Sequence, residues 1–207
     1  MWLAVVSQPF DCSTIVPALR EVDKENGEFW VGNPFQFSYS KENLSAFEHN
    51  GVFFNTGNRD FLDMSFISGG DNRGDSRTVI GTDINQDGMP DLLIRQVGGG
   101  ALVVYQNNFP KTNWLVISLR GEQSNSAGIG AKIAVTRGDL TVRRELLPIV
   151  NFLSQTPSRV HIGMADSDVA KEITIQWPAG GTTILKNIQA NQHIRVYEKD
   201  DHIEKLY

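Results

Sequence analysis

Apolar and polar residues alternate clearly in the second half of the chain. In residues 113–120, Leu115, Ile117 and Leu119 occupy every second position, and residues 172–177 repeat the pattern with isoleucine and tryptophan. A period of two places successive side chains on opposite faces of a strand. Each segment is therefore predicted to be a strand that buries one side only.

Short turn sequences separate these predicted strands. Residues 131–137 and 140–147 are joined only by Gly-Asp at 138–139, a connection that favours a type II′ hairpin turn. A Pro-Ala-Gly-Gly sequence at 178–181 folds another strand back on the next. Residues 112–199 thus hold roughly six or more short antiparallel strands, which predicts a compact β-sandwich or barrel.

The first half of the chain has a different residue pattern. Residues 17–24 begin with a proline, carry apolar side chains at helical spacing and end before Asn-Gly, which predicts a short helix. Phenylalanine-rich pieces then alternate with loops dense in Gly, Asn and Asp, and a polar stretch at 107–112 forms the boundary. We therefore predict an all-β protein with these parts: an N-terminal segment at 1–30, a first β region at 31–110, a small antiparallel sandwich or barrel at 111–199 and a tail at 200–207.

Composition narrows the function classes. The net charge is -5, with no long run of lysine or arginine, so nucleic acid is not an expected partner. The single cysteine, Cys12, excludes an internal disulfide. No apolar stretch approaches the roughly 18 residues that cross a bilayer, so we expect no membrane span. The N-terminus lacks the basic start and long apolar run of a secretory signal peptide.

Residues 83–91 place oxygen-bearing side chains at a spacing that suits calcium. Asp83, Asn85 and Asp87 occupy loop positions 1, 3 and 5, and Gly88 at position 6 permits the backbone to curl around an ion. Calcium takes about six to eight oxygen ligands, mostly from carboxylates and carbonyls. The spacing therefore predicts a Ca²⁺ loop.

Two further residues complete the predicted shell. The peptide oxygen of Met89 lies at position 7 and the carboxylate of Asp91 at position 9. An EF-hand would need an acid at position 12, which is Ile94 here, and a helix after it. The apolar run at 92–94 instead predicts a strand, so the EF-hand interpretation fails. The alternative is a polar turn that binds nothing, because Asp, Asn and Gly favour turns without a metal.

The loop and the residues ahead of it resemble a known repeat. The pattern D-x-N-x-D-G-x-x-D, followed directly by a strand, resembles the calcium loop of FG-GAP repeats, also called VCBS repeats, which form the blades of integrin-type β-propellers. The preceding stretch at 50–69 is similar at six positions: Phe53, Asn55, Gly57, Phe61, Asp63 and Ser65. This resemblance implies one or two propeller-like blades within residues 31–110.

Three later motifs resemble the ASPIC/UnbV domain found at the C-terminus of cartilage acidic protein and its bacterial relatives. They are NWLVISLRGEQSNSAGIGAKIAV, NFLSQTPSRVHIGM and ITIQWPAGGTTILKNIQANQHIRVYE. The family's usual Ser-Asn-Arg reads Ser-Asn-Ser at 124–126, its Phe-Gly-Leu-Gly reads Ile-Gly-Met-Ala at 162–165, and its Trp-Pro-Ser-Gly reads Trp-Pro-Ala-Gly at 177–180. The resemblance implies a β-domain and assigns it no activity.

The other motifs in the sequence are weaker evidence for a function. Arg-Gly-Asp at 73–75 spells a tripeptide that integrins read, but it is more often a simple turn. His49, His161, His193 and His202 are too scattered for a local metal motif, and the nearby acids at 60 and 63 and at 166 and 168 are interpreted as solvated. No sequence pattern pairs a nucleophile with a base, so we do not expect an enzyme.

These observations lead to a functional hypothesis. The chain is expected to be a non-enzymatic, calcium-binding module for protein interaction or adhesion, and the C-terminal part of a larger propeller-containing protein. The resemblance implies an extracellular, periplasmic or cell-surface location. A propeller closes with about four to eight blades, so the strand edges would pair with upstream blades or with another chain.

The partner itself, whether a protein or a glycan, is not identified by the sequence. One alternative is a carbohydrate-binding module that uses Trp30, Tyr39 or Trp114 as a stacking platform. The other is an accessory domain of a polysaccharide-acting hydrolase.

Overall fold

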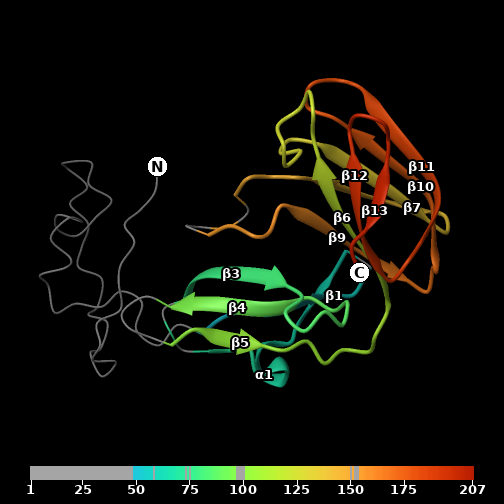
Figure 1. The fold of residues 1–207 in the computed structure, drawn as a ribbon. Coiled ribbons are helices and arrows are strands. Elements are labelled where there is room, and N and C mark those ends of the chain that lie inside the picture. Colours follow the sequence, from blue (N-terminus) through green and yellow to red (C-terminus); the bar gives the residue numbers. More distant parts are fainter. Residues whose placement is uncertain are drawn as a thin grey trace, which may run out of the picture. The chain divides into compact units, whose positions relative to one another are not determined.

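The computed structural model describes residues 49–57, 59–72, 74, 76–96, 101–149, 151 and 154–207. The predicted helix at 17–24, Trp30, Tyr39, and Arg73 and Asp75 of the Arg-Gly-Asp sequence lie outside these residues. Almost all the regular structure described is strand, which confirms the all-β prediction (Figure 1). No helix in the described part of the chain has the length and apolar character needed to cross a membrane.

The chain divides into two compact units. The first contains Met1–Val79 and Ile94–Tyr105, and the second contains Ile80–Leu93 and Gln106–Tyr207. The loop at 83–91, which the sequence pattern associates with the first half, is thus grouped with the C-terminal strands. The loop therefore lies in the same unit as the residues that it contacts.

Short strands make up the N-terminal part of the described fold. Strand β1 (Phe53–Asn55) pairs antiparallel with β2 (Phe61–Asp63), and the four-residue helix α1 (Ser65–Ser68) follows. A three-stranded sheet has the order β3-β4-β5. Its strands are β3 (Ser76–Thr82), β4 (Asp91–Gln96) and β5 (Val103–Tyr105). Among the described residues, no sheet closes on itself.

The second unit contains two four-stranded sheets, with the orders β13-β12-β6-β9 and β11-β10-β7-β8. The strands are β6 (Asn113–Arg120), β7 (Lys132–Arg137), β8 (Leu140–Glu145), β9 (Arg159–Ala165), β10 (Val169–Gln176), β11 (Thr182–Gln189), β12 (Gln192–Tyr197) and β13 (Ile203–Lys205). The pairings are antiparallel with one exception, since β6 and β12 run parallel. Strand β13 lies in the segment predicted to be a tail.

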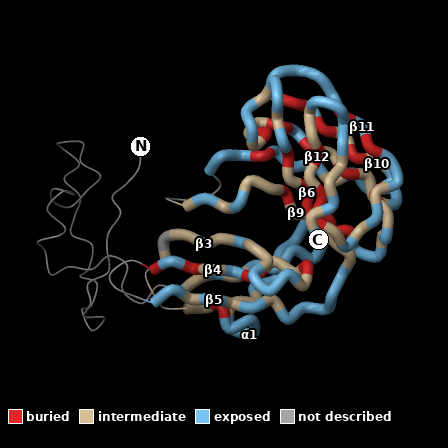
Figure 2. Tube along the Cα trace, viewed as in Figure 1, coloured by how far each residue is buried: buried red, intermediate tan, exposed pale blue. Residues whose placement is uncertain are grey.

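One hydrophobic core joins both sheets of the second unit. Leu115, Ile117 and Leu119 of β6 lie in it, as the alternation predicted, together with Ile173 and Ile175 of β10. Buried positions accordingly concentrate along β6, β9, β10 and β12 (Figure 2). Burying one large aliphatic side chain stabilises a fold by about 1.5–3 kcal/mol. The core therefore comes from the predicted faces of the predicted strands.

The hairpin between β7 and β8 also follows the prediction. Its two connecting residues are Gly138, with φ of 53°, and Asp139, which is not among the residues with positive φ. A type I′ turn would need positive φ at both positions, whereas type II′ needs it only at the first. Glycine is suited to that first position because it lacks a Cβ.

The opposite face of β6 corrects one prediction. Val116 is 3% exposed although it points away from the core, so β6 does not bury one side only. In the sheet register Val116 lies between His161 of β9 and His193 of β12, and His193 is itself buried. Alternation cannot show this, because the burial of an outer face depends on what another segment places over it. We refer to Trp114, Val116, His161, His193 and Tyr207 as the outer-face cluster.

Replacing a core residue tests this arrangement. Ile173→Ala should lower the free energy of unfolding by about 2–5 kcal/mol, since it leaves a cavity among residues from both sheets. Ile184→Ala is the matched control because Ile184 lies on neighbouring β11 with 55% of its surface exposed. Its cost should be below about 1 kcal/mol. Urea unfolding measures both, and equal costs would contradict the assigned core.

Candidate functional site

The predicted calcium loop connects β3 to β4. Two residues with left-handed backbone conformations shape it: Gln86 has φ of 59° and Gly88 has φ of 87°. The strand β4 begins at Asp91, so the segment after the loop is a strand and not a helix. This agrees with the sequence argument against an EF-hand.

Side chains at the first three predicted ligand positions turn inward and accept hydrogen bonds from the loop backbone. Asp83 accepts two, from the N–H of Asp87 at 3.1 Å and from the N–H of Gly88 at 2.8 Å. The Asn85 side chain accepts from the same Asp87 N–H at 3.2 Å, and the Asp87 carboxylate accepts from the Met89 N–H at 2.9 Å. These bonds hold the backbone in its curl.

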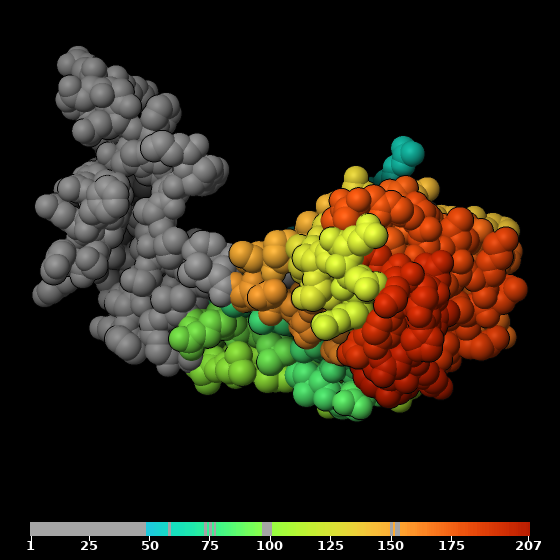
Figure 3. All heavy atoms as spheres, turned by 45° about the horizontal axis from the view of Figure 1, so that its top comes forward, coloured from blue at the N-terminus to red at the C-terminus, as the bar shows by residue number. Residues whose placement is uncertain are grey.

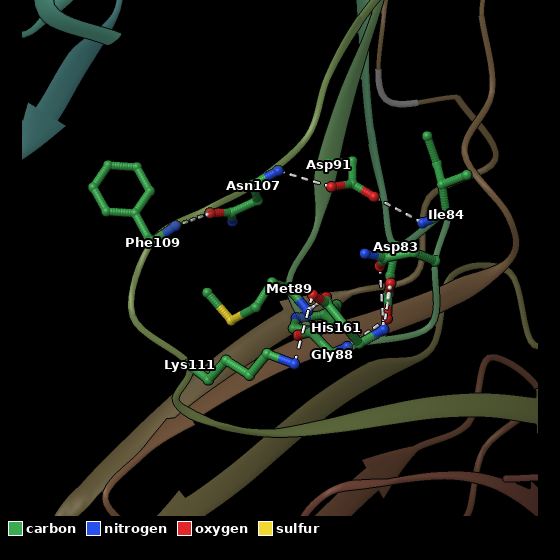
Figure 4. Close-up of polar contacts among 11 residues, drawn as sticks. Asp83, Ile84, Gly88, Met89, Asp91, Asn107, Phe109, Lys111 and His161 are labelled. Atoms are coloured by element: carbon green, nitrogen blue, oxygen red, sulfur yellow. Dashed lines mark hydrogen bonds and ion pairs between the residues drawn. The ribbon is translucent and has the colours of Figure 1, made fainter.

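Asp91 has a different environment. It is 3% exposed, and its two oxygens accept hydrogen bonds from the N–H groups of Ile84, at 3.0 Å, and Asn107, at 2.8 Å (Figure 4). The Asn107 side chain in turn donates to the Pro90 carbonyl at 3.1 Å. Asp91 therefore joins the two ends of the loop to the segment that leads to β6. Within the described residues it forms no ion pair.

The donor set suits a hard cation, although its members are not all assembled. Each carboxylate oxygen has about two lone pairs, so one accepted hydrogen bond leaves further capacity. Carboxylate, amide and peptide oxygens are the ligands that calcium prefers. However, no group of three or more His, Cys, Asp or Glu side chains in the described ranges lies close enough together to hold a metal ion. Asp83, Asn85 and Asp87 share the backbone of one turn, whereas the Asp91 oxygens point to Ile84 and Asn107.

The loop rests on the outer-face cluster. The His161 Nε2–H donates to the Gly88 carbonyl at 3.0 Å, and Figure 4 shows this side chain beside the loop. A Cβ built on Gly88 would lie 1.9 Å from Nε1 of Trp114. Arg159 adds a long contact of 3.4 Å to the Thr82 hydroxyl. Glycine is therefore needed at 88 both for its positive φ and for the space beside the indole.

His161 is well suited to this contact. Burial lowers its pKa, and the hydrogen bond to the Gly88 carbonyl and the nearby Asp83 carboxylate oppose that shift only in part. The imidazole is therefore neutral at pH 7, and the tautomer that carries hydrogen on Nε2 can donate to a carbonyl. The sequence placed His161 on a polar strand face, but it contained no signal for a loop docked there.

The sequence also gave no sign of a contact between Ser118 and His193. Ser118 Oγ lies 3.0 Å from His193 Nε2, and burial, with a smaller effect of Arg159 and Arg195, lowers the His193 pKa to about 4. His193 Nδ1 is buried and has no hydrogen-bond partner in the described part of the chain. A Ser-His-Asp site needs an acid at that nitrogen to orient the imidazole. The pair thus lacks the third group of a catalytic triad.

The turn at 122–124, which ends at the first serine of the Ser-Asn-Ser sequence, forms an anion nest that is filled by a carboxylate of the protein itself. The Glu198 carboxylate accepts hydrogen bonds from three successive backbone N–H groups, at Glu122, Gln123 and Ser124, over 2.6 to 2.9 Å. The Ser124 hydroxyl adds a fourth at 2.6 Å. In Figure 3 the yellow surface near residue 125 accordingly borders the red surface of the C-terminal residues. Asn125 closes the same loop through two bonds of 2.8 Å to the Ile129 backbone.

The comparisons with known proteins bear on this region. Residues 121–203 match the family model described as ASPIC and UnbV. The matched segment runs from the residue after β6 to the first residue of β13, so this ASPIC/UnbV domain includes the nest and both sheets of the second unit in part. A search of curated proteins found no match. The match confirms the ASPIC/UnbV part of the resemblance, and the FG-GAP part stays a prediction.

Two family motifs can now be placed in the ASPIC/UnbV domain. Trp177, from the Trp-Pro motif, is buried and donates from Nε1 to the Thr183 hydroxyl at 2.8 Å. Thr183 in turn donates to Asp201, which ties the β10–β11 hairpin to the segment before β13. Ala165 stands where the family has its last glycine and adopts φ of 50°. Both features are structural and leave the loop at 83–91 as the candidate site.

Substituting Gly88 tests how the loop is seated. Gly88→Ala should destabilise the protein by about 1–3 kcal/mol more than Gly180→Ala, because overpacking against Trp114 adds to the backbone strain. Gly180 is the matched control, since it has φ of 99° but open space around its Cα. Urea unfolding gives the stabilities, and the Trp114 indole N–H resonance reports the docking. Equal stabilities with an unchanged resonance would refute the contact.

The nest predicts a pH dependence. Partial desolvation raises the Glu198 pKa, but hydrogen bonds from Ser124, Glu122 and Gln123 outweigh it and lower the pKa below the ordinary 4.5. A lowered folded pKa contributes stability that is present above 4.5 and is lost as the pH falls through the folded value. Glu198→Gln should therefore reduce stability at pH 7 and flatten its acid dependence.

Urea unfolding from neutral pH to below 4.5 measures this effect. Glu145→Gln is the control, because Glu145 is exposed at the end of β8 and makes the same change of charge. An unaltered pH profile in Glu198→Gln would show that the nest does not stabilise the fold.

Proposed function

We propose that residues 83–91 bind Ca²⁺ and that the ion stabilises the loop on the outer-face cluster of the second unit. The protein would then act as a calcium-stabilised, non-enzymatic binding module outside the cytoplasm. The observation that carries the proposal is the inward turn of three predicted ligands, Asp83, Asn85 and Asp87, around one curled backbone.

The burial of Asp91 supports the same proposal. A carboxylate that is 3% exposed has lost most of its hydration, which is costly unless hydrogen bonds or an opposite charge compensate. Two backbone N–H groups compensate in part. Among the described residues, the ion pair at the loop joins Asp87 to Lys111, whose side chain is 74% exposed and lies 3.9 Å away. An exposed pair of this kind contributes about 0–1 kcal/mol, so a cation would add compensation that the described residues do not provide.

Calcium would act here as a structural staple. An ion that binds only the folded form stabilises it by mass action. Extracellular modules bind calcium at about 10⁻⁴ to 10⁻³ M, a concentration range met outside the cytoplasm. The resemblance of residues 50–91 to FG-GAP repeats supports the same location and a role in adhesion or protein interaction.

Calcium should raise the melting temperature of the protein. At a calcium concentration about ten times the Kd, the stabilisation is about 1.4 kcal/mol, or about 3–6 °C for a chain of this size. Asp87→Asn should remove most of this shift, because it deletes one charge but keeps an oxygen that can accept the Met89 N–H. Scanning calorimetry and calcium titration measure the two effects.

Two comparisons make the test specific. Asp139→Asn makes the same charge change on a fully exposed turn and should leave the calcium response intact. Magnesium should produce a smaller shift, since it demands tighter octahedral geometry and keeps its waters. A calcium response that survives Asp87→Asn would rule out this loop as the binding site.

A further inference from the structure

We propose that a polar cleft of the second unit binds a neutral saccharide. The cleft has a volume of about 470 Å³, within the range of about 300–1,000 Å³ that is usual for small-ligand sites. It lies where β6 begins, β9 ends and β11 turns into β12. Its lining includes Asp87, Lys111, Asn113, Trp114, Asp166 and Asn191.

The amide groups of the cleft are fixed before any ligand arrives. The backbone N–H of Trp114 donates to Asn191 Oδ1 at 3.2 Å, and the backbone N–H of Asn191 donates to the Trp114 carbonyl at 2.6 Å. The Asn191 side chain also donates to Asn113 Oδ1 at 2.8 Å. A lining that is already ordered loses little conformational entropy on binding, which favours affinity.

The aromatic part of the lining is fixed as well. The Trp114 ring lies nearly parallel to the His161 ring, with an interplanar angle of 15° and centroids 6.2 Å apart. Trp114 is among the residues that line the cleft, so a fixed aromatic residue stands among lining side chains that are mostly polar. An aromatic ring beside polar groups suits a ligand that has both C–H faces and hydroxyl groups.

The backbone around the cleft is strained. Ala165 has φ of 50° and Asn191 has φ of 57°, and both residues line the cleft. A left-handed conformation is unfavourable for alanine, whereas asparagine adopts it more readily, and residues strained in this way concentrate at binding sites. Ala165 is therefore the strained residue of the cleft lining.

The charged side chains of the cleft lining indicate which class of ligand it would bind. Asp166 is exposed, and in the described part of the chain its carboxylate makes neither a hydrogen bond nor an ion pair. Asp87 and Asp166 together outnumber the single positive charge of Lys111, which disfavours an anionic ligand. An amine ligand would offer no hydrogen-bond acceptor to the Lys111 ammonium or to the amide donors of the cleft. A neutral sugar matches all of them, because each hydroxyl both donates and accepts.

This site goes beyond the calcium proposal. It shares only Asp87 with the predicted loop, and none of its proposed contacts to the sugar requires a metal. Sugar binding should therefore persist when calcium is removed with EDTA.

The test is a titration of the full chain, once in EDTA and once in calcium, with the methyl glycosides of glucose, galactose, mannose and N-acetylglucosamine at millimolar concentration. Methyl glucuronide serves as the anionic counterpart of methyl glucoside. Chemical-shift changes of the Trp114 indole N–H localise the binding. Asp166→Ala is the test variant, and Asp168→Ala is its control, because Asp168 is exposed in the same turn but does not line the cleft.

At least one neutral glycoside should bind and shift the Trp114 resonance. Loss of charge-assisted hydrogen bonds in Asp166→Ala should weaken this binding by about tenfold or more, while Asp168→Ala should not. Methyl glucuronide should bind more weakly than methyl glucoside. The proposal is overturned if no neutral glycoside binds, if the two substitutions act equally, if the glucuronide binds better, or if binding requires calcium. None of these outcomes would alter the calcium-dependent melting temperature, so the two proposals fail separately.

Discussion

The contact between Gly88 and the outer-face cluster determines where the loop at 83–91 lies on the second unit. Gly88 approaches the Trp114 indole where no side chain would fit, and its carbonyl accepts a hydrogen bond from His161. Trp114 is also among the residues that line the polar cleft. One close approach of backbone to ring thus joins the loop to a residue of the cleft lining.

The burial of the outer face of β6 is related to this contact. A sheet face that meets water normally carries polar side chains, yet Val116 is buried between two histidines. Tyr207 lies edge-on to His193, with ring centroids 5.0 Å apart, and it is tilted against Trp114. Segments distant in sequence therefore cover this face with rings, and burial lowers the pKa of both histidines. Neutral imidazoles allow the face to be buried without leaving an unpaired positive charge.

Local patterns in the sequence predicted much of this fold. Alternation at 113–120 and 172–177 identified β6 and β10 and their buried faces, and Gly138 identified a hairpin. The spacing of Asp83, Asn85 and Asp87 predicted a curled loop, because these side chains accept hydrogen bonds from nearby N–H groups. Each of these features depends on residues within one turn or one strand of one another.

Features that depend on distant residues were not predictable in this way. Turn chemistry predicts hairpins, which are antiparallel, so it gave no sign that β12 runs parallel to β6. Nothing near His161 indicates that its partner is a carbonyl at Gly88. Asp91 illustrates the same limit, since spacing made it a predicted ligand but gave no sign that its oxygens accept hydrogen bonds from Ile84 and Asn107. Because those two hydrogen bonds already close the loop, a cation would add to a curl that side-chain to backbone hydrogen bonds already hold.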